Sequence, residues 1–254
     1  MVKVGQADKN YRRVIDNILE NGLPDDPKDV RPSFKDGTPA TTLSVMNEYM
    51  QYDNSGDEAF LLTTKQCAKK DPLTEIDWIW QQMSNIVQDL RDAGCTVWDE
   101  WEQEDGTIGK AYGYQLANKK RKVVIDELFL DMYFNGEFSI KLKSGGDNTT
   151  PDTGTEQLRN LLMGKVVKLN QVDFLLYNLK NNATSRRITT TLNSIEDADE
   201  MALEACVYET RWKKWGGKVN LTVNIRSNDM ALKLVPSDRN VSRTTLLKRG
   251  TLIA

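Results

Sequence analysis

Apolar residues recur every three or four positions in several stretches of the chain, and this period predicts amphipathic helices. One such stretch covers residues 7–21 and is followed by Gly22, a residue that commonly ends a helix. Residues 169–182 predict a second helix. A longer helix is predicted after Asp71-Pro72, with Gly94 at its end. Its apolar stripe consists of Ile76, Ile79, Trp80, Met83, Ile86, Val87 and Leu90.

Strict alternation of apolar and polar residues near the C-terminal end predicts a half-buried strand of a β-hairpin. Its apolar positions are Val219, Leu221, Val223 and Ile225. Residues 215–217 (Trp-Gly-Gly) are interpreted as the turn. A three-residue turn places Cys206 opposite Arg226, whereas a two-residue turn places it opposite Ser227 and directs Arg226 to the other face.

Further elements are predicted more locally. A strand is expected near Thr41, a strand edge running into a turn over residues 95–109, and a strand over residues 186–193. Ser194 is expected to start a short helix, with Asp197 as the acidic residue of a capping box. Helices and strands therefore mix along the chain.

The length of 254 residues favours one domain (residues 1–254) carrying an inserted segment. The insertion is expected at about residues 119–168, where short helical pieces surround residues 143–155. This stretch, KSGGDNTTPDTGT, is rich in Gly, Thr and Asp and predicts a flexible loop.

Composition excludes several classes of protein. A net charge of −3 argues against a broad nucleic-acid surface. A membrane span is not expected, because no window of about 18 uncharged apolar residues exists. The N-terminus lacks the apolar stretch of a signal peptide, and three cysteines without CxxC spacing suit a reduced, cytoplasmic protein.

The chain contains no histidine, which removes Ser-His-Asp and Cys-His mechanisms in their usual form. Histidine-based metal sites are removed as well, and we expect no metal. No phosphate-binding GxxxxGK[ST] or GxGxxG sequence follows a predicted strand. Any chemistry therefore rests on Cys, Asp, Glu, Tyr, Lys and Arg.

Among these residues, Cys206 is the candidate nucleophile, because a neighbouring guanidinium favours the thiolate. The alternative is an ordinary core thiol. Arg186 and Arg187 could grip a phosphate, or could pair with the acidic run at residues 196–200. Glu75 could be a carboxylate in an apolar pocket or a solvated residue of a first helical turn.

Six stretches resemble the thymidylate synthase family, in particular its branch in Bacillus and its phages. They are RPSFKDGTPATTLSV, LLTTK, TVWDEWEQEDGTIGKAYGYQL, NNATSRRI, MALEACVYET and RSNDMAL. The resemblance covers about residues 8–118 and 169–232. It implies an α+β fold with a mixed β-sheet flanked by helices. Residues 233–254 do not match the family pattern, so the C-terminal part of this fold is expected to be incomplete.

The resemblance implies a role for each matching residue. Cys206 would add to C6 of the uracil ring of dUMP, with Glu75 organising proton-carrying waters and Tyr112 assisting removal of the C5 proton. Arg226 would contact both the thiolate and the substrate phosphate. The other implied substrate-binding residues are Arg31, Arg186, Arg187, Ser227, Asn228 and Asp229. The implied folate-binding residues are Lys65, Trp98, Trp101 and Asp229.

The implied reaction is the reductive methylation of dUMP to dTMP, with 5,10-methylenetetrahydrofolate as one-carbon donor and hydride source. The implied partner is a second copy of the chain, because Arg186 and Arg187 would reach the phosphate across a homodimer interface. Two alternatives stay open. One is a dUMP hydroxymethyltransferase of phage type. The other is a catalytically inactive dimeric scaffold or nucleotide-binding relic.

Overall fold

The computed structural model describes residues 5–30, 33–34, 36–54, 70–142 and 156–226. The chain divides into two compact units, residues 1–73 with 225–254 and residues 74–224. Helices and short antiparallel sheets occur along the chain, so the predicted α+β class is confirmed. In the described ranges, no helix is both long and apolar enough to cross a membrane.

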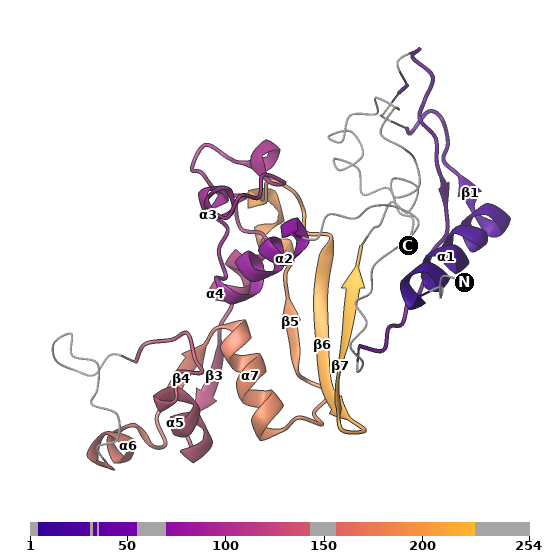
Figure 1. The fold of residues 1–254 in the computed structure, drawn as a ribbon. Helices are drawn as coiled ribbons and strands as arrows, with labels where there is room; N and C mark the ends of the chain where they lie inside the picture. The colour runs from indigo at the N-terminus through magenta and orange to yellow at the C-terminus, as the bar shows by residue number, and fades with distance from the viewer. Residues whose placement is uncertain (1–4, 31–32, 35, 55–69, 143–155, 227–254) are drawn as a thin grey trace. The chain divides into compact units, whose positions relative to one another are not determined.

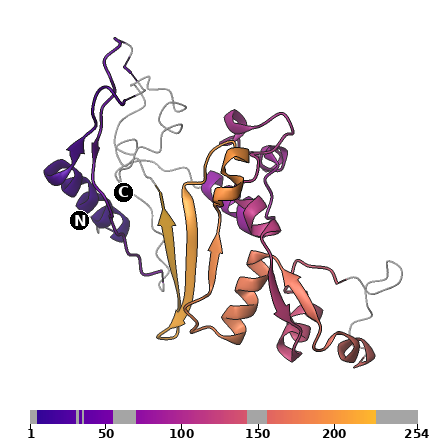
Figure 2. The ribbon, with the colours of Figure 1, turned by 180° about the vertical axis from the view of Figure 1, so that it is seen from behind.

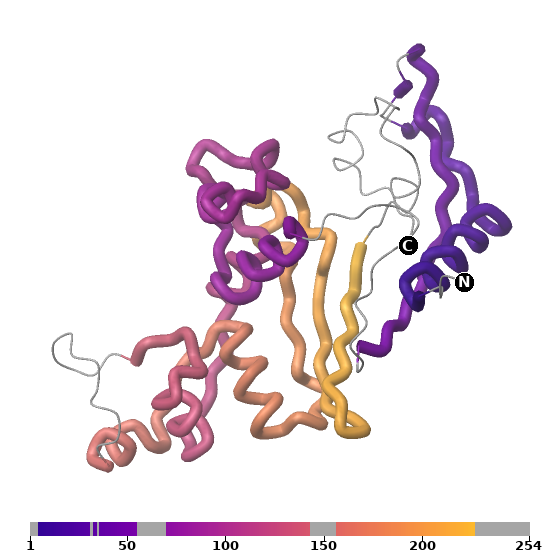
Figure 3. Tube along the Cα trace, viewed as in Figure 1, coloured from indigo at the N-terminus to yellow at the C-terminus, as the bar shows by residue number. Residues whose placement is uncertain are grey.

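The first unit is built on helix α1 (Gln6–Asn21) and the extended chain that returns beside it, as the trace shows (Figure 3). Strands β1 (Leu23–Pro24) and β2 (Leu43–Ser44) pair antiparallel. The small core consists of Tyr11, Val14, Ile18 and Val45. Arg13 forms an ion pair with Glu48 at 2.7 Å, which attaches the returning chain to the helix.

The second unit contains a three-stranded antiparallel sheet of order β5-β6-β7, whose strands lie side by side (Figure 1). The strands are β5 (Thr189–Thr191), β6 (Val207–Trp215) and β7 (Lys218–Ile225). Thr190 pairs with Thr210 in register, and their buried hydroxyl groups are 2.6 Å apart. This bond satisfies two polar groups that burial would otherwise penalise.

Short helices precede and flank this sheet. Helix α2 (Lys70–Ile76) continues directly as a π-helical turn, η1 (Asp77–Gln81). The others are α3 (Val87–Asp92), α4 (Gly113–Asn118), α7 (Gln171–Asn181) and the 3-10 turns η2 (Asp99–Trp101) and η3 (Ile195–Glu200). The largest core cluster joins them and includes Trp78, Val87, Leu90, Trp98, Ile108, Tyr112, Leu116 and Ala205.

A second apolar cluster lies around residues 121–177. Strand β3 (Arg121–Val124) pairs antiparallel with β4 (Val166–Leu169), next to α5 (Glu127–Phe134) and α7 (Figure 2). Helix α6 (Glu156–Leu162) completes the set. The cluster is centred on Phe129, Leu130, Met132 and Leu169. The cluster also includes Tyr177, so it extends beyond residues 119–168 into α7, and the insertion stays a prediction. Its loop at residues 143–155 lies outside the described residues.

The helices predicted over residues 7–21 and 169–182 are confirmed as α1 and α7. The prediction of a single long helix after Asp71-Pro72 was wrong. The helix is interrupted after η1, where Met83 adopts a left-handed φ of 49°, and α3 begins at Val87. Gly113 packs so closely here that a Cβ on it would lie 2.0 Å from the Ser84 carbonyl oxygen. Tertiary packing therefore overrides the helical period.

The predicted β-hairpin is confirmed as β6 and β7, but two of its details were wrong. Only Gly216 and Gly217 connect the strands, with φ of 60° and 76°, as a type I′ turn requires. The expected three-residue turn is thereby corrected, and with it the register that would have set Cys206 opposite Arg226. The expectation of half-burial was also wrong, because every residue of β7 is exposed in the described part of the chain.

Two shorter predictions also needed correction. Residues 95–109 form no strand; the chain there turns through η2 and makes an isolated bridge from Thr107 to Ile86. The helix after Ser194 exists as the 3-10 turn η3, but the Ser194 side chain makes no capping bond. The Asp197 carboxylate instead accepts a hydrogen bond from Gln115.

Candidate active site

Cys206 lies directly before strand β6, at the end of the segment that follows η3. Its side chain is half-buried. Its backbone N–H donates a hydrogen bond to the phenolic oxygen (Oη) of Tyr112 at 2.9 Å. Two residues that are distant in the sequence, both predicted for the site, are therefore in direct contact.

Tyr112 occupies the position before the first residue of α4 and has an unusual backbone conformation, with φ 47° and ψ −104°. A left-handed φ in a bulky residue is strained and persists only where the surroundings enforce it. The ring is buried in the main core. Burial raises the pKa of its hydroxyl, and the neighbouring Cys206 and Glu75 raise it further. The phenol therefore stays protonated and can donate a hydrogen bond.

Glu75 lies in the last turn of α2, and its Oε1 accepts a hydrogen bond from the indole N–H of Trp98 at 2.7 Å. Burial raises the pKa of this carboxyl, and the bond from Trp98 opposes the rise in part. Glu75 is half-buried, bonded to Trp98 and in the last turn of its helix, so the interpretation as a solvated residue of a first helical turn was wrong.

The Trp98 ring joins these two contacts. Its centroid lies 5.5 Å from that of Tyr112, in an edge-to-face arrangement. A continuous series of contacts therefore runs from Glu75 through Trp98 and Tyr112 to the Cys206 backbone. It brings together a thiol, a protonated phenol and a carboxyl of raised pKa, which are groups suited to nucleophilic addition with accompanying proton transfer.

The two candidate folate-binding tryptophans differ in their surroundings. Trp98 is buried against Trp78, with ring centroids 6.3 Å apart, and its N–H is used by Glu75. Trp101 is only partly buried and packs on the edge of the same core. Contact of either ring with folate stays a prediction.

The candidate phosphate-binding arginines Arg186 and Arg187 precede β5 in a turn, and both are exposed. The acidic run that could have paired with them faces elsewhere, since Asp197 pairs with Lys119 at 2.7 Å and Glu200 with Lys110 at 2.6 Å. Arg226 directly follows β7 and is half-buried. The two-residue turn removes the register from which a pair with Cys206 was inferred, so contact of Arg226 with the thiolate stays a prediction of the family resemblance alone.

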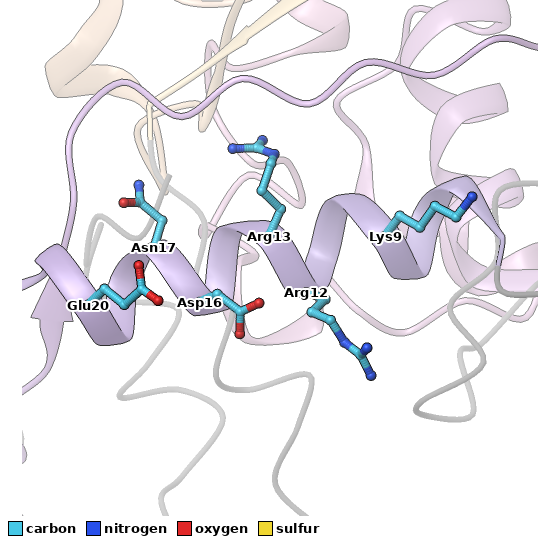
Figure 4. Close-up of a pocket in the computed structure, with 6 residues that line it drawn as sticks. All are labelled: Lys9, Arg12, Arg13, Asp16, Asn17 and Glu20. Atoms are coloured by element: carbon cyan, nitrogen blue, oxygen red, sulfur yellow. The ribbon is translucent and has the colours of Figure 1, made fainter.

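The remaining predicted site residues, Arg31, Lys65, Ser227, Asn228 and Asp229, lie outside the described residues. A surface hollow runs along α1, lined by Lys9, Arg12, Arg13, Asp16, Asn17 and Glu20 (Figure 4). Its lining combines three cations with two carboxylates and contains none of the predicted site residues.

Gln115 and Asp197 were not predicted to belong to the site, yet their contact joins α4 to η3. Gln115 is completely buried and lies three residues after Tyr112. A polar residue flanked by Tyr114 and Leu116 so close to a candidate catalytic residue is the signal that could have identified it.

Comparison with known proteins places this site in context. A family model described as thymidylate synthase matches residues 9–248. Thymidylate synthases of Bacillus subtilis subsp. natto and of Bacillus phage phi3T are both 44% identical over 228 residues, which is 89% of this chain and 66% of each relative. The chain therefore spans about two thirds of the length of these relatives.

The solved structure of thermostable thymidylate synthase A from Bacillus subtilis aligns with a TM-score of 0.67 and 42% identity. It covers 89% of this chain, and the chain covers 66% of it. Sequence and fold agree along most of the described chain. The chain belongs to the thymidylate synthase family.

Proposed function

We propose that this chain carries the nucleotide-methylating site of a thymidylate synthase, converting dUMP to dTMP with 5,10-methylenetetrahydrofolate. The observation that carries the proposal is the series of contacts from Glu75 through Trp98 and Tyr112 to Cys206. Three of these residues are the ones to which the family resemblance assigns the chemistry, and Trp98 is assigned to folate.

In the proposed reaction the Cys206 thiolate adds to C6 of the uracil ring, which makes C5 nucleophilic toward the one-carbon group of the folate. Loss of the C5 proton is accompanied by breakage of the bond between the one-carbon group and the folate nitrogen, which leaves a methylene group on C5. Hydride transfer from tetrahydrofolate, which becomes dihydrofolate, converts this methylene to the methyl group while the bond between C6 and Cys206 breaks and releases dTMP. Adding the thiolate places negative charge on the pyrimidine ring, so a nearby group must deliver and withdraw protons. The protonated Tyr112 hydroxyl and the Glu75 carboxyl suit that task, because burial raises both pKa values.

Substrate binding is proposed to rest on guanidinium groups, since a dianionic phosphate is best held by several charge-assisted hydrogen bonds. Arg31 and Arg226 would act within one subunit, together with Ser227. Arg186 and Arg187 would act from a second copy of the chain, and their exposure suits a contact with a partner. The complete site would then require a homodimer.

The remaining assignments concern the pyrimidine and the folate. Asn228 and Asp229 are proposed to contact the substrate, and Asp229 also the pterin. Lys65, Trp98 and Trp101 are proposed to contact the folate.

Release of tritium from C5-labelled dUMP in the presence of methylenetetrahydrofolate tests the proposal on the full chain. We expect release from the wild type and none from Cys206→Ala. Product analysis then separates a methyl from a hydroxymethyl product. A folded dimer that binds dUMP but releases no tritium would contradict catalysis and favour a nucleotide-binding relic.

A further inference from the structure

The chain segments that precede Tyr112 and Cys206 are hydrogen-bonded to each other a few residues before these two candidate catalytic residues. The backbone N–H of Lys110 donates to the Glu200 carbonyl at 2.9 Å, and the N–H of Ala202 donates to the Ile108 carbonyl at 3.1 Å. One segment continues to Tyr112 and the other to Cys206. The relative position of these two residues therefore depends on this junction.

The junction is unusually close. Gly109 forms a bridge with Met201, and its φ of 70° is left-handed. A Cβ at Gly109 would lie 2.0 Å from the Glu200 carbonyl oxygen, so only glycine permits this approach. The backbones of the two segments are in contact without any side chain between them.

Asp197 is the central side chain of the junction. Its Oδ2 accepts a hydrogen bond from Gln115 Nε2 at 3.0 Å and lies 2.7 Å from Lys119 Nζ. Lys110 Nζ lies 3.7 Å from the other carboxylate oxygen. The same Gln115 nitrogen also donates to the Lys110 carbonyl at 2.7 Å. One carboxylate thus ties η3, which leads to Cys206, to α4, which begins directly after Tyr112.

The charges around Asp197 suit a carboxylate that stays ionised. Lys110 and Lys119 face it, and each lysine also contacts a second acid, Glu200 and Glu196 respectively. Hydrogen bonding from Gln115 and the ion pair with Lys119 lower the pKa of Asp197 to about 2.

We propose that Asp197 is a positioning residue that, through Gln115 and the two lysines, holds Cys206 against Tyr112. The proposal rests on the proposed function in treating Cys206 as the reactive thiol. Asp197 does not touch Cys206 itself. It acts by fixing the segments whose ends meet in the bond between the Cys206 N–H and Tyr112 Oη.

Alkylation of Cys206 by iodoacetamide, followed peptide by peptide with mass spectrometry on the full chain, tests the proposal. The reaction needs neither nucleotide nor folate, so its result is independent of turnover and of the proposed function. Cys206 is half-buried, and loosening its segment exposes the thiol for longer. We expect Asp197→Asn and Tyr112→Phe each to accelerate alkylation about 3-fold to 10-fold.

The double variant separates positioning from a simple charge effect. Loss of the Asp197 negative charge would also favour the Cys206 thiolate. Such a charge effect would shift the midpoint of the pH–rate profile. In the double variant, its rate increase would multiply with the rate increase caused by Tyr112→Phe. Positioning instead raises the rate at the alkaline plateau. Because both changes release the same contact, the double variant should react about as fast as either single variant.

Asp197→Glu keeps the charge and should return the rate to within about 2-fold of the wild type. Asp131→Asn is the matched control, since it removes a carboxylate that pairs with Arg159 in another part of the unit, and it should leave the rate unchanged. If Asp197→Asn does not fold, Lys119→Gln replaces it in the test, because it removes the more exposed partner of the Lys119–Asp197 ion pair. An unchanged plateau rate in a folded Asp197→Asn or Lys119→Gln protein, or full multiplication in the double variant, would overturn the proposal.

Discussion

The half-buried carboxylate of Glu75 accepts a hydrogen bond from the Trp98 indole N–H at 2.7 Å. Burial raises the pKa of this carboxyl above its ordinary value of 4.5. The folded protein therefore binds the proton more tightly than the unfolded chain does. This stabilisation is complete at pH values below 4.5 and is lost as the pH rises through the raised pKa.

Glu75→Gln should remove this pH dependence, because the amide cannot ionise and can still accept the bond from Trp98. We expect the variant to be more stable than the wild type at pH 8 and closer to it at pH 4.5. Urea unfolding at a series of pH values measures the difference. Parallel curves of unfolding free energy for the two proteins would contradict the raised pKa.

Trp98→Phe should keep most of the ring packing against Tyr112 while it removes the only hydrogen-bond donor of the indole. Glu75 would then lose its bond in a buried environment, which costs about 1–3 kcal/mol of unfolding free energy. Thermal and urea unfolding check the loss. Trp101→Phe is the matched control, since Trp101 packs at the partly buried edge of the core, and it should cost clearly less.

The helices α1 and α7 and the β6–β7 hairpin could be predicted from the sequence because each rests on local periodicity or a Gly-Gly turn. The interruption at Met83 could not, because its cause lies in another segment. Gly113 packs against Ser84, and these two residues are separated by 113 − 84 = 29 positions in the sequence. The alternation of apolar and polar residues likewise did not predict that every residue of β7 is exposed.

The site was predictable in part. Family resemblance identified Cys206, Tyr112 and Glu75, and the structure places them in one connected set. It did not supply the contacts themselves, because the bond between Glu75 and Trp98 spans 23 positions and depends on the packing of α2 against the segment at η2. Asp197 was misassigned to a helix cap because its true partner, Gln115, lies 82 positions away.

Gly113→Ala tests the close approach that interrupts the predicted long helix. The added Cβ would lie 2.0 Å from the Ser84 carbonyl oxygen and 2.8 Å from the Met83 carbonyl carbon, both of them backbone atoms. We expect a loss of about 1–3 kcal/mol of unfolding free energy, because the backbone must shift to relieve the overlap. Gly5→Ala is the control, since its Cβ would meet only Asp8 Oδ2 at 3.9 Å. Equal stability of the two variants in urea unfolding would contradict the close contact.

The hairpin turn gives a prediction in which two substitutions should differ. Gly217→Ala places a Cβ at a φ of 76° and should cost about 1–2 kcal/mol. Gly216→Asn, at a φ of 60°, creates the Asn-Gly sequence that type I′ turns favour and should be nearly neutral. Thermal unfolding followed by circular dichroism compares them. A neutral Gly217→Ala would indicate a longer, more open turn of the kind first inferred from the sequence.

Asp173 should be the most sensitive carboxylate of the second apolar cluster. Its side chain is almost completely buried and accepts hydrogen bonds from the Ser139 N–H and hydroxyl, the Ile140 N–H and the Asn170 side chain. Asp173→Asn keeps the shape but leaves one acceptor oxygen, and its amide group would face donors. Each bond lost from a charged acceptor costs about 1.5–3 kcal/mol.

Hydrogen exchange should locate this loss, because the Ser139 and Ile140 amides are held by the Asp173 carboxylate while β6 is held by its own sheet. We expect faster exchange at residues 138–142 and in α7 of Asp173→Asn, with little change in β6. Asp131→Asn, on the exposed face of α5, provides the comparison and should leave both regions unchanged. Uniform acceleration across β5 and β6 as well would show that the second cluster does not unfold separately from the main core.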